Sequence, residues 1–213
     1  MARRYQELMM TPAVQEAQRH YYGRAPQFPT SAVSENTPLG PDEIEFIGER
    51  DSFYLATVTE TGWPYVQHRG GPIGFLRVVN PHALAFDDFL GNRQLLSTGN
   101  LAGGNDRVAL FLMDYPQRTR LKIMGHARVV DAQDEPALAR DLIPDKQLLP
   151  KVERVFIVDV VSFDWNCAQY ITPRYTEEEV ERIIAAPLKA RIRELEAELS
   201  GPSNLDVDEG REL

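Results

Sequence analysis

The stretch FYLATVTETGWPYVQHRGGPIGF, Phe53 to Phe75, decides the fold class. Its first part, FYLATV, is aromatic and β-branched, TETG has turn composition, and WPYVQHR alternates in polarity, so a β-hairpin is predicted. The glycines and proline that follow Arg69 permit positive φ and fix a turn. They also place backbone N–H groups beside an arginine, an arrangement that suits an anionic ligand.

Further strand-like segments follow this hairpin at near-regular intervals. They are Gly74–Val79, Ala83–Phe86, Val108–Met113, Thr119–Asp131 and Arg154–Asp164. Short strands with turn residues between them predict an antiparallel barrel or sandwich rather than a βαβ sheet. Two short helices, Asn92–Leu101 and Ala132–Ile143, are predicted to interrupt the series.

The flanks of this β-rich region have a different composition. Residues 1–40 predict a helix over Thr11–Tyr22 and a Pro- and Gly-rich segment that wraps a surface. Residues 41–175 then form the barrel, and residues 176–213 form a C-terminal helix, which Pro187 kinks or divides, and an acidic tail. Along this helix four aliphatic residues are spaced four, three and four apart, as in a coiled-coil seam: Leu188, Ile192, Leu195 and Leu199. Contact with its own domain and contact with a second chain both remain open.

Composition limits the classes of function. The 213 residues are 43% hydrophobic and 26% charged, as in a globular protein, and the formal net charge of −9 argues against broad nucleic-acid binding. A single cysteine, Cys167, excludes an intrachain disulfide and a multi-cysteine metal site, and the four histidines lie far apart in the sequence. No metal site is therefore predicted. With no transmembrane segment and no secretory signal, a cytoplasmic protein is expected.

Two polar clusters are candidates for ligand binding. The first cluster ends a predicted strand and consists of Gln67, His68, Arg69 and Gly70. In it Arg69 is either an exposed charge or a residue that binds a phosphate through two hydrogen bonds. Arg93 stands in the first turn of the predicted helix, where it opposes the helix dipole. One interpretation is that Arg93 and Asn92 bind a phosphate at the helix N-terminus; the other is that Asn92 only caps the helix. Asn100 lies at the C-terminal end of the same predicted helix.

Two further clusters are less specific. Arg118, Arg120 and Lys122 recur with period two, which is typical of a solvated strand face. After the last strand comes a polar segment with Trp165, Asn166, Cys167, Gln169 and Arg174. In that segment Trp165 fits a core position, and Cys167 fits a buried small residue better than a nucleophile.

The order of these motifs resembles the pyridoxamine 5'-phosphate oxidase-like family of FMN-binding split barrels. The ATV–turn–Gly-x-Pro hairpin, the Gly-Asn-Arg helix start with Asn-Leu at its end, and the R-x-K-I-x-G strand occur in family order between Pro41 and Asp131. The resemblance implies a six-stranded antiparallel split barrel that forms homodimers with FMN at the subunit interface.

The resemblance also implies roles for individual residues. Arg69 is expected at the flavin phosphate, with Gln67, His68 and the Gly70–Gly71 backbone beside the cofactor. Arg93, with Asn92, is expected at further phosphate oxygens, with Asn100 at the end of the same helix. Lys122 matches a position that reaches the flavin or its phosphate, and the partner subunit is expected to border the ring with Trp165, Asn166 and Gln169.

The chain departs from true pyridoxamine-phosphate oxidases in two places. Gly-Gly-Pro-Ile-Gly-Phe replaces the apolar run ending in lysine, and the C-terminal substrate segment with its histidine is missing. Oxidation of pyridoxamine phosphate is therefore not expected, and the prediction is a flavin-dependent oxidoreductase of unidentified substrate. The alternatives are a non-catalytic flavin-binding or sensing protein, or a split barrel that uses a deazaflavin or heme.

Overall fold

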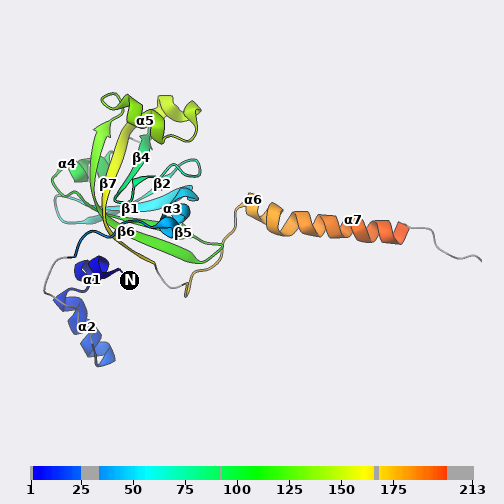
Figure 1. Ribbon diagram of the computed structural model, residues 1–213, viewed down its shortest axis with the longest axis horizontal. Coiled ribbons are helices and arrows are strands. Elements are labelled where there is room, and N and C mark those ends of the chain that lie inside the picture. The colour runs from blue at the N-terminus through cyan, green and yellow to red at the C-terminus, as the bar shows by residue number, and fades with distance from the viewer. Residues whose placement is uncertain (1, 25–33, 92, 166–167, 201–213) are drawn as a thin grey trace, which may run out of the picture. The chain divides into compact units, whose positions relative to one another are not determined.

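A seven-stranded antiparallel sheet forms the centre of the unit that spans Met1–Ile171, in a computed structural model that describes residues 2–24, 34–91, 93–165 and 168–200 (Figure 1). The strand order is β2-β1-β5-β6-β7-β4-β3. The strands are β1 (Ser52–Val58), β2 (Pro64–Gly70), β3 (Arg77–Asn80), β4 (Ala83–Phe89), β5 (Arg107–Asp114), β6 (Thr119–Asp131) and β7 (Val152–Trp165). The mainly β class predicted from the sequence is confirmed.

The family resemblance implied six strands, one fewer than the structure contains, whereas the strand-like segments found in the sequence already number seven. The predicted segment Gly74–Val79 corresponds to β3, a four-residue edge strand that pairs with β4. It forms because the chain turns at Gly74, whose φ is +76°, and then extends alongside β4. Its shortness suits an edge position, where unpaired backbone groups would otherwise attract another strand.

Alternating burial along the strands builds the core. In β5 every second residue, from Val108 to Asp114, is buried, as expected for a sheet with one face on the interior. Strands β4 and β7 are more continuously buried because α5 (Pro136–Leu142) and the 3₁₀ turn η1 (Lys146–Lys151) cover their other face. Three phenylalanines, Phe53, Phe86 and Phe156, are the largest fully buried side chains.

Helix α3 (Pro41–Gly48) is fixed to the sheet by Arg50. The Arg50 guanidinium donates to Asp114 Oδ2 at 2.8 Å and to the carbonyl of Phe46 at 3.1 Å. It also lies over the Phe46 ring, 4.5 Å from the centroid. These contacts join the end of α3 to the end of β5.

The N-terminal segment contains one helix more than predicted. Helix α2 (Pro12–Tyr22) begins at Thr11, as expected, and α1 (Arg3–Met9) precedes it. Helix α1 has one buried residue, Tyr5, and its Glu7 accepts hydrogen bonds from the side chain and backbone of Ser34, at 2.6 Å and 3.0 Å. These bonds lower the pKa of Glu7 to about 2.

Residues 172–213 form a separate unit. Within it, α6 (Glu177–Val180), a π-helical turn η2 (Glu181–Ala185) and α7 (Ala186–Ser200) follow one another without a break. Pro187 lies inside α7, directly after this π turn, so the helix is not divided at the proline; the π turn precedes a residue that has no N–H for the regular hydrogen-bond series. Among the described helices, none is both long and apolar enough to cross a membrane.

Candidate functional site

A pocket of about 180 Å³ lies beside β2, at the ends of several strands. Its wall is built by β2, the end of β4, residues 91 and 93–95 of the following loop, the start of α4 (Leu96–Ala102) and the start of β7. The lining residues are Tyr65, Gln67, Arg69, Asp88, Phe89, Gly91, Arg93, Gln94, Leu95, Leu96, Ser97, Thr98, Glu153 and Arg154.

Strand β2 presents alternate side chains to this pocket. Tyr65, Gln67 and Arg69 line it, whereas Val66 and His68 are exposed on the opposite face. The register explains the division, since successive side chains of a strand point to opposite faces. Gln67 is further held by Ser97, a buried residue of α4 whose hydroxyl donates to Gln67 Oε1 at 3.0 Å.

Arg69 is largely buried rather than a free strand-end charge, with 13% of its side chain exposed. One Nη atom donates to Asp88 Oδ1, and the guanidinium lies over the Phe156 ring, 4.9 Å from the centroid. Its Nε is buried and has no hydrogen-bond partner among the residues that the structure describes. A buried arginine that leaves a donor unused is unusual, because buried polar groups are normally satisfied.

Asp88 joins two arginines. Arg154 Nε donates to Asp88 Oδ2 at 3.0 Å, and Arg154 also contacts Glu153 at 2.7 Å. Burial alone would lower the pKa of Arg154, but the hydrogen bond and charge of Asp88, aided by Glu153, raise it above its ordinary value. The carboxylate therefore holds both guanidinium groups in place at the pocket wall.

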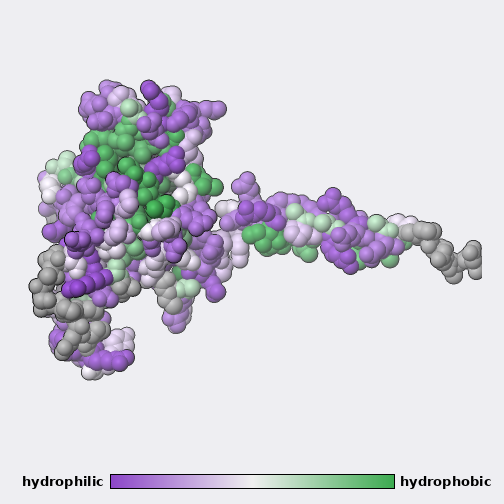
Figure 2. Space-filling model, viewed as in Figure 1, coloured by the Kyte–Doolittle hydropathy of each residue, from purple (hydrophilic) through white to green (hydrophobic). Residues whose placement is uncertain are grey.

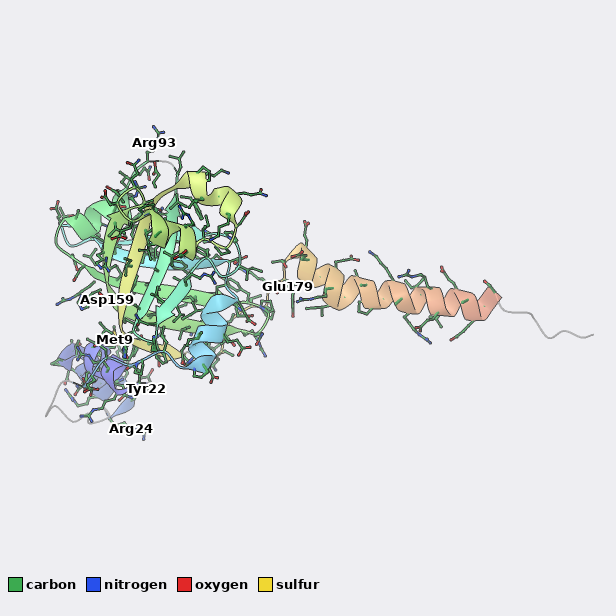
Figure 3. All side chains as sticks on the ribbon, turned by 45° about the horizontal axis from the view of Figure 1, so that its top comes forward. Met9, Tyr22, Arg24, Arg93, Asp159 and Glu179 are labelled. Atoms are coloured by element: carbon green, nitrogen blue, oxygen red, sulfur yellow. The ribbon has the colours of Figure 1, made fainter. Side chains whose placement is uncertain are left out.

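The loop before α4 has an uncommon backbone. Arg93 and Leu95 have φ values of +61° and +56°, in the left-handed region that residues other than glycine seldom adopt. Helix α4 begins at Leu96, so the prediction that Arg93 occupies the first turn of a helix is wrong. The left-handed residue Leu95 delays the helix, and Arg93 instead extends outward from the loop at the end of the barrel (Figure 3). Strained backbone of this kind is often found at binding sites.

The structure brings together three of the predicted cofactor-binding residues, Gln67, Arg69 and Arg93. His68 lies on the other face of β2, and Gly70 ends that strand outside the pocket lining. Two further predicted residues lie outside the described residues: Asn92 and Asn166. Cys167 is outside them as well.

The remaining four predicted residues lie away from the pocket lining. Asn100 is buried and donates to Thr57 Oγ1 at 2.8 Å, which ties α4 to β1. Lys122 lies 3.4 Å from Asp164 and over the ring of Tyr5, 5.2 Å from its centroid.

The last two of these four lie at the end of β7 and in the turn after it. Trp165 donates from its indole nitrogen to Glu43 Oε1 at 2.6 Å and packs edge-on against Phe46. Gln169 is exposed in the turn after β7.

The glycine run after Arg69 has a packing role in this chain. A Cβ on Gly71 would lie 2.7 Å from Cγ of Phe75, so only glycine lets this buried ring pack against the backbone. The Gly71 N–H donates to the carbonyl of Asp51 at 2.9 Å. The close approach predicted for this glycine is therefore made by a core side chain.

Sequence reasoning missed the acidic residue Asp88 and the third arginine of the pocket, Arg154. Asp88 stands in the strand ALAFDDF, where two acidic residues interrupt a buried apolar run, and that interruption was the available signal. Arg154 has no such signal, since an arginine at the start of a strand is common. Within the described part of the chain, no group of three potential metal-ligating side chains comes together.

Comparison with known proteins shows the family of this chain. The sequence profile of the family described as pyridoxamine 5'-phosphate oxidase matches residues 41–155, which include strands β1 to β6 and the first four residues of β7. The chain belongs to this family. No functionally curated protein matches it.

Several solved structures are similar to this member of the family. A Lactobacillus delbrueckii protein named after pyridoxamine 5'-phosphate oxidase is 20% identical, with a TM-score of 0.45 over 60% of this chain and 93% of that chain. A Clostridium acetobutylicum protein related to general stress protein 26 is 12% identical, with a TM-score of 0.46 over 65% and 94%. HutZ, the heme storage protein of Vibrio cholerae, is 18% identical, with a TM-score of 0.38 over 58% and 90%. These likenesses add no argument about function.

Proposed function

We propose that this protein binds FMN, with the flavin phosphate at Arg69 and Arg93, and that it acts as a flavin-dependent oxidoreductase. The observation that carries the proposal is the buried, unpartnered Nε of Arg69 in a pocket that Arg93 also lines. Family membership supports the choice of a flavin, and the chain's own residues support the position of its phosphate.

The donors at the pocket fit a phosphate group. Arginine carries five N–H donors in a planar fork, and Asp88 engages only one nitrogen of Arg69. Arg93 is exposed and makes no ion pair with any residue of the described chain. Three arginines and two acidic residues line the pocket, so its side chains carry a formal charge of +1 in a protein of net charge −9.

The size of the pocket points to a second subunit. A volume of about 180 Å³ is below the roughly 300–1,000 Å³ usual for pockets that enclose a whole ligand. One chain would therefore hold the phosphate end, and a second copy would supply the remaining surface.

When bound, FMN supplies one- and two-electron transfer, and the protein supplies binding, orientation and electrostatics. Arg69 would be oriented by Asp88 and by its contact with the Phe156 ring. Arg93 would close the phosphate site from the loop. The positive charge of both residues would favour an anionic ligand over a neutral one.

The proposal is tested by the absorption spectrum of the purified protein, followed by titration with FMN and reduction by NADH or NADPH. Arg93→Ala is the decisive variant because this exposed side chain contributes little to folding. Arg69→Lys keeps the positive charge of Arg69 and removes the planar guanidinium, whose N–H groups can bind a phosphate through two hydrogen bonds. We expect each change to weaken FMN binding by about 1.5–3 kcal/mol, the range for a hydrogen bond to a charged group.

Arg128→Ala is the matched control, since Arg128 is exposed on β6 outside the pocket lining. Equal FMN affinity in the control and both pocket variants would overturn the phosphate assignment. A protein that takes up heme or a deazaflavin but no FMN would overturn the choice of cofactor. FMN uptake without reduction by either nucleotide would contradict the proposed catalysis with these donors and favour a flavin-binding or sensing role.

A further inference from the structure

The C-terminal helix carries a stripe of aliphatic side chains that are exposed to solvent. Within α7, four residues with four-, three- and four-residue spacing have exposed fractions from 41% to 86%: Leu188, Ile192, Leu195 and Leu199. Figure 2 shows hydrophobic residues gathered along one side of this helix. A long helix in water depends mostly on packing of its apolar face, so a stripe of this kind calls for a partner.

The charges beside the stripe are divided along the helix. Lys189, Arg191 and Arg193 occupy its first part, and Glu194, Glu196 and Glu198 its second part. Acidic residues near a helix C-terminus are unfavourable for the helix dipole, so this distribution does not serve the stability of the helix alone. Four of these charged residues flank the stripe directly at the e and g positions of the heptad: Lys189, Arg191, Glu196 and Glu198.

We propose that α7 pairs with α7 of a second copy of this chain in antiparallel orientation. In this pairing Leu188 meets Leu199 of the other copy, and Ile192 meets Leu195, which gives four apolar layers related by two-fold symmetry. The flanking positions then place Lys189 opposite Glu196 and Arg191 opposite Glu198. Each of these ion pairs occurs twice, so the basic part of one helix lies along the acidic part of the other.

The orientation follows from the charges. In a parallel pair, residues at g contact residues at e five positions later in the partner, so only Arg191 and Glu196 would meet. Lys189 and Glu198 would have no opposite charge across the seam, and the two helix dipoles would point the same way. The antiparallel pair uses all four charges. Ion pairs within one helix, such as Arg191 to Glu194 at 2.9 Å, are exposed and contribute little stability. Replacing them with ion pairs between the two helices therefore costs little free energy.

Disulfide trapping in the full chain tests the pairing and its direction. Leu188→Cys and Leu199→Cys are made in separate chains that carry Cys167→Ser, and the two chains are co-expressed with different tags. We expect disulfides between the two different chains, and none within a preparation of either variant alone. In the antiparallel pair equivalent residues are about 16 Å apart along the axis, beyond the reach of a disulfide. Disulfides in each variant alone would indicate a parallel pair, and no disulfide in any preparation would indicate packing on another surface; either result overturns the proposal.

A charge-reversal cycle provides an independent readout. Glu196→Lys and Lys189→Glu should each lower the yield of the trapped pair, with an association constant reduced on the order of tenfold, and the double variant should restore it. A parallel pair would instead be restored by combining Glu196→Lys with Arg191→Glu. Arg193→Glu is the control, because Arg193 lies away from the seam and should leave the yield unchanged.

The pairing is independent of flavin binding. FMN content should be the same in the charge variants and the parent chain, since these residues lie in a separate unit of the chain from the pocket. If the cysteine variants form no disulfide while the unmodified chain still takes up FMN, the helix pairing is overturned and the FMN proposal is not. Loss of FMN uptake in the Arg93→Ala variant would leave the pairing intact.

Discussion

Arg154 Nε donates a 3.0 Å hydrogen bond to one carboxylate oxygen of Asp88, and the other oxygen of the same carboxylate accepts from Arg69. All three side chains are at most 15% exposed. One acidic residue thus sets the position of both arginines in the pocket wall.

Removal of that acidic residue should destabilise the fold. In Asp88→Ala two largely buried guanidinium groups lose the carboxylate that they share, and only Arg154 keeps an acidic partner, Glu153, so we expect the free energy of unfolding to fall by about 3–5 kcal/mol. Urea denaturation followed by circular dichroism measures the change. Asp106→Asn, in an exposed pair with His126 at 3.0 Å, is the control and should change stability by less than about 1 kcal/mol. Equal effects of the two changes would show that the shared carboxylate has no special role.

Asp87 should make stability depend on pH. It is buried on the other face of β4, and burial raises the pKa of its carboxyl from 3.8 to about 7, although the charge of Lys146 opposes the shift. Between about pH 4 and pH 7 the folded protein holds a proton that the unfolded chain has released. Stability therefore falls as the pH rises through this range, by at most about 4 kcal/mol.

Asp87→Asn removes this titration. We expect its free energy of unfolding to be nearly constant from pH 4.5 to pH 7.5 and to exceed that of the parent protein at the upper end. Urea denaturation at closely spaced pH values gives both curves. Parallel curves for the two proteins would mean that Asp87 titrates alike in the folded and unfolded chains.

Gly125 in β6 should not tolerate a side chain. Its Cβ would lie 2.7 Å from both the carbonyl oxygen of Asp159 and Cγ1 of Val158, at the point where the β6–β7 register shifts. Gly125→Ala should therefore cost about 1–3 kcal/mol of stability. Gly99→Ala is the matched control, since this helical glycine has no atom within 4 Å of a Cβ, and alanine should stabilise the helix by up to about 1 kcal/mol. Thermal unfolding of the two variants should shift in opposite directions.

The bond between Trp165 and Glu43 should contribute to stability. Trp165→Phe removes the 2.6 Å hydrogen bond from the indole to the buried carboxylate, which keeps its bond from the Gly40 N–H. A loss of about 1.5–3 kcal/mol is expected for a hydrogen bond to a charged group. Trp63→Phe, at a residue that is 73% exposed, serves as the reference. If both variants unfold at the same urea concentration, the bond has no net effect.

Much of the fold was predictable because it depends on local patterns. The hairpin at 53–69, the alternation of Tyr65, Gln67 and Arg69, and the capped helix after Thr11 follow from side-chain periodicity and turn chemistry. All seven strands were predicted from composition and alternation, but the bounds of β3 were not, because this four-residue strand is defined by its pairing with β4. The start of α4 was misplaced because two residues adopt positive φ without being glycine.

The sequence by itself determined the periodicities, the turns and the charged residues on each face, since these depend on the order of neighbours along the chain. Only the tertiary structure decided which of them meet. It gave Arg69 a carboxylate nineteen positions away, placed Arg93 in the same pocket wall, and gave Trp165 a bond to Glu43 that crosses 122 positions. Such contacts depend on how strands from distant parts of the chain pair into one sheet, and no local pattern records that pairing.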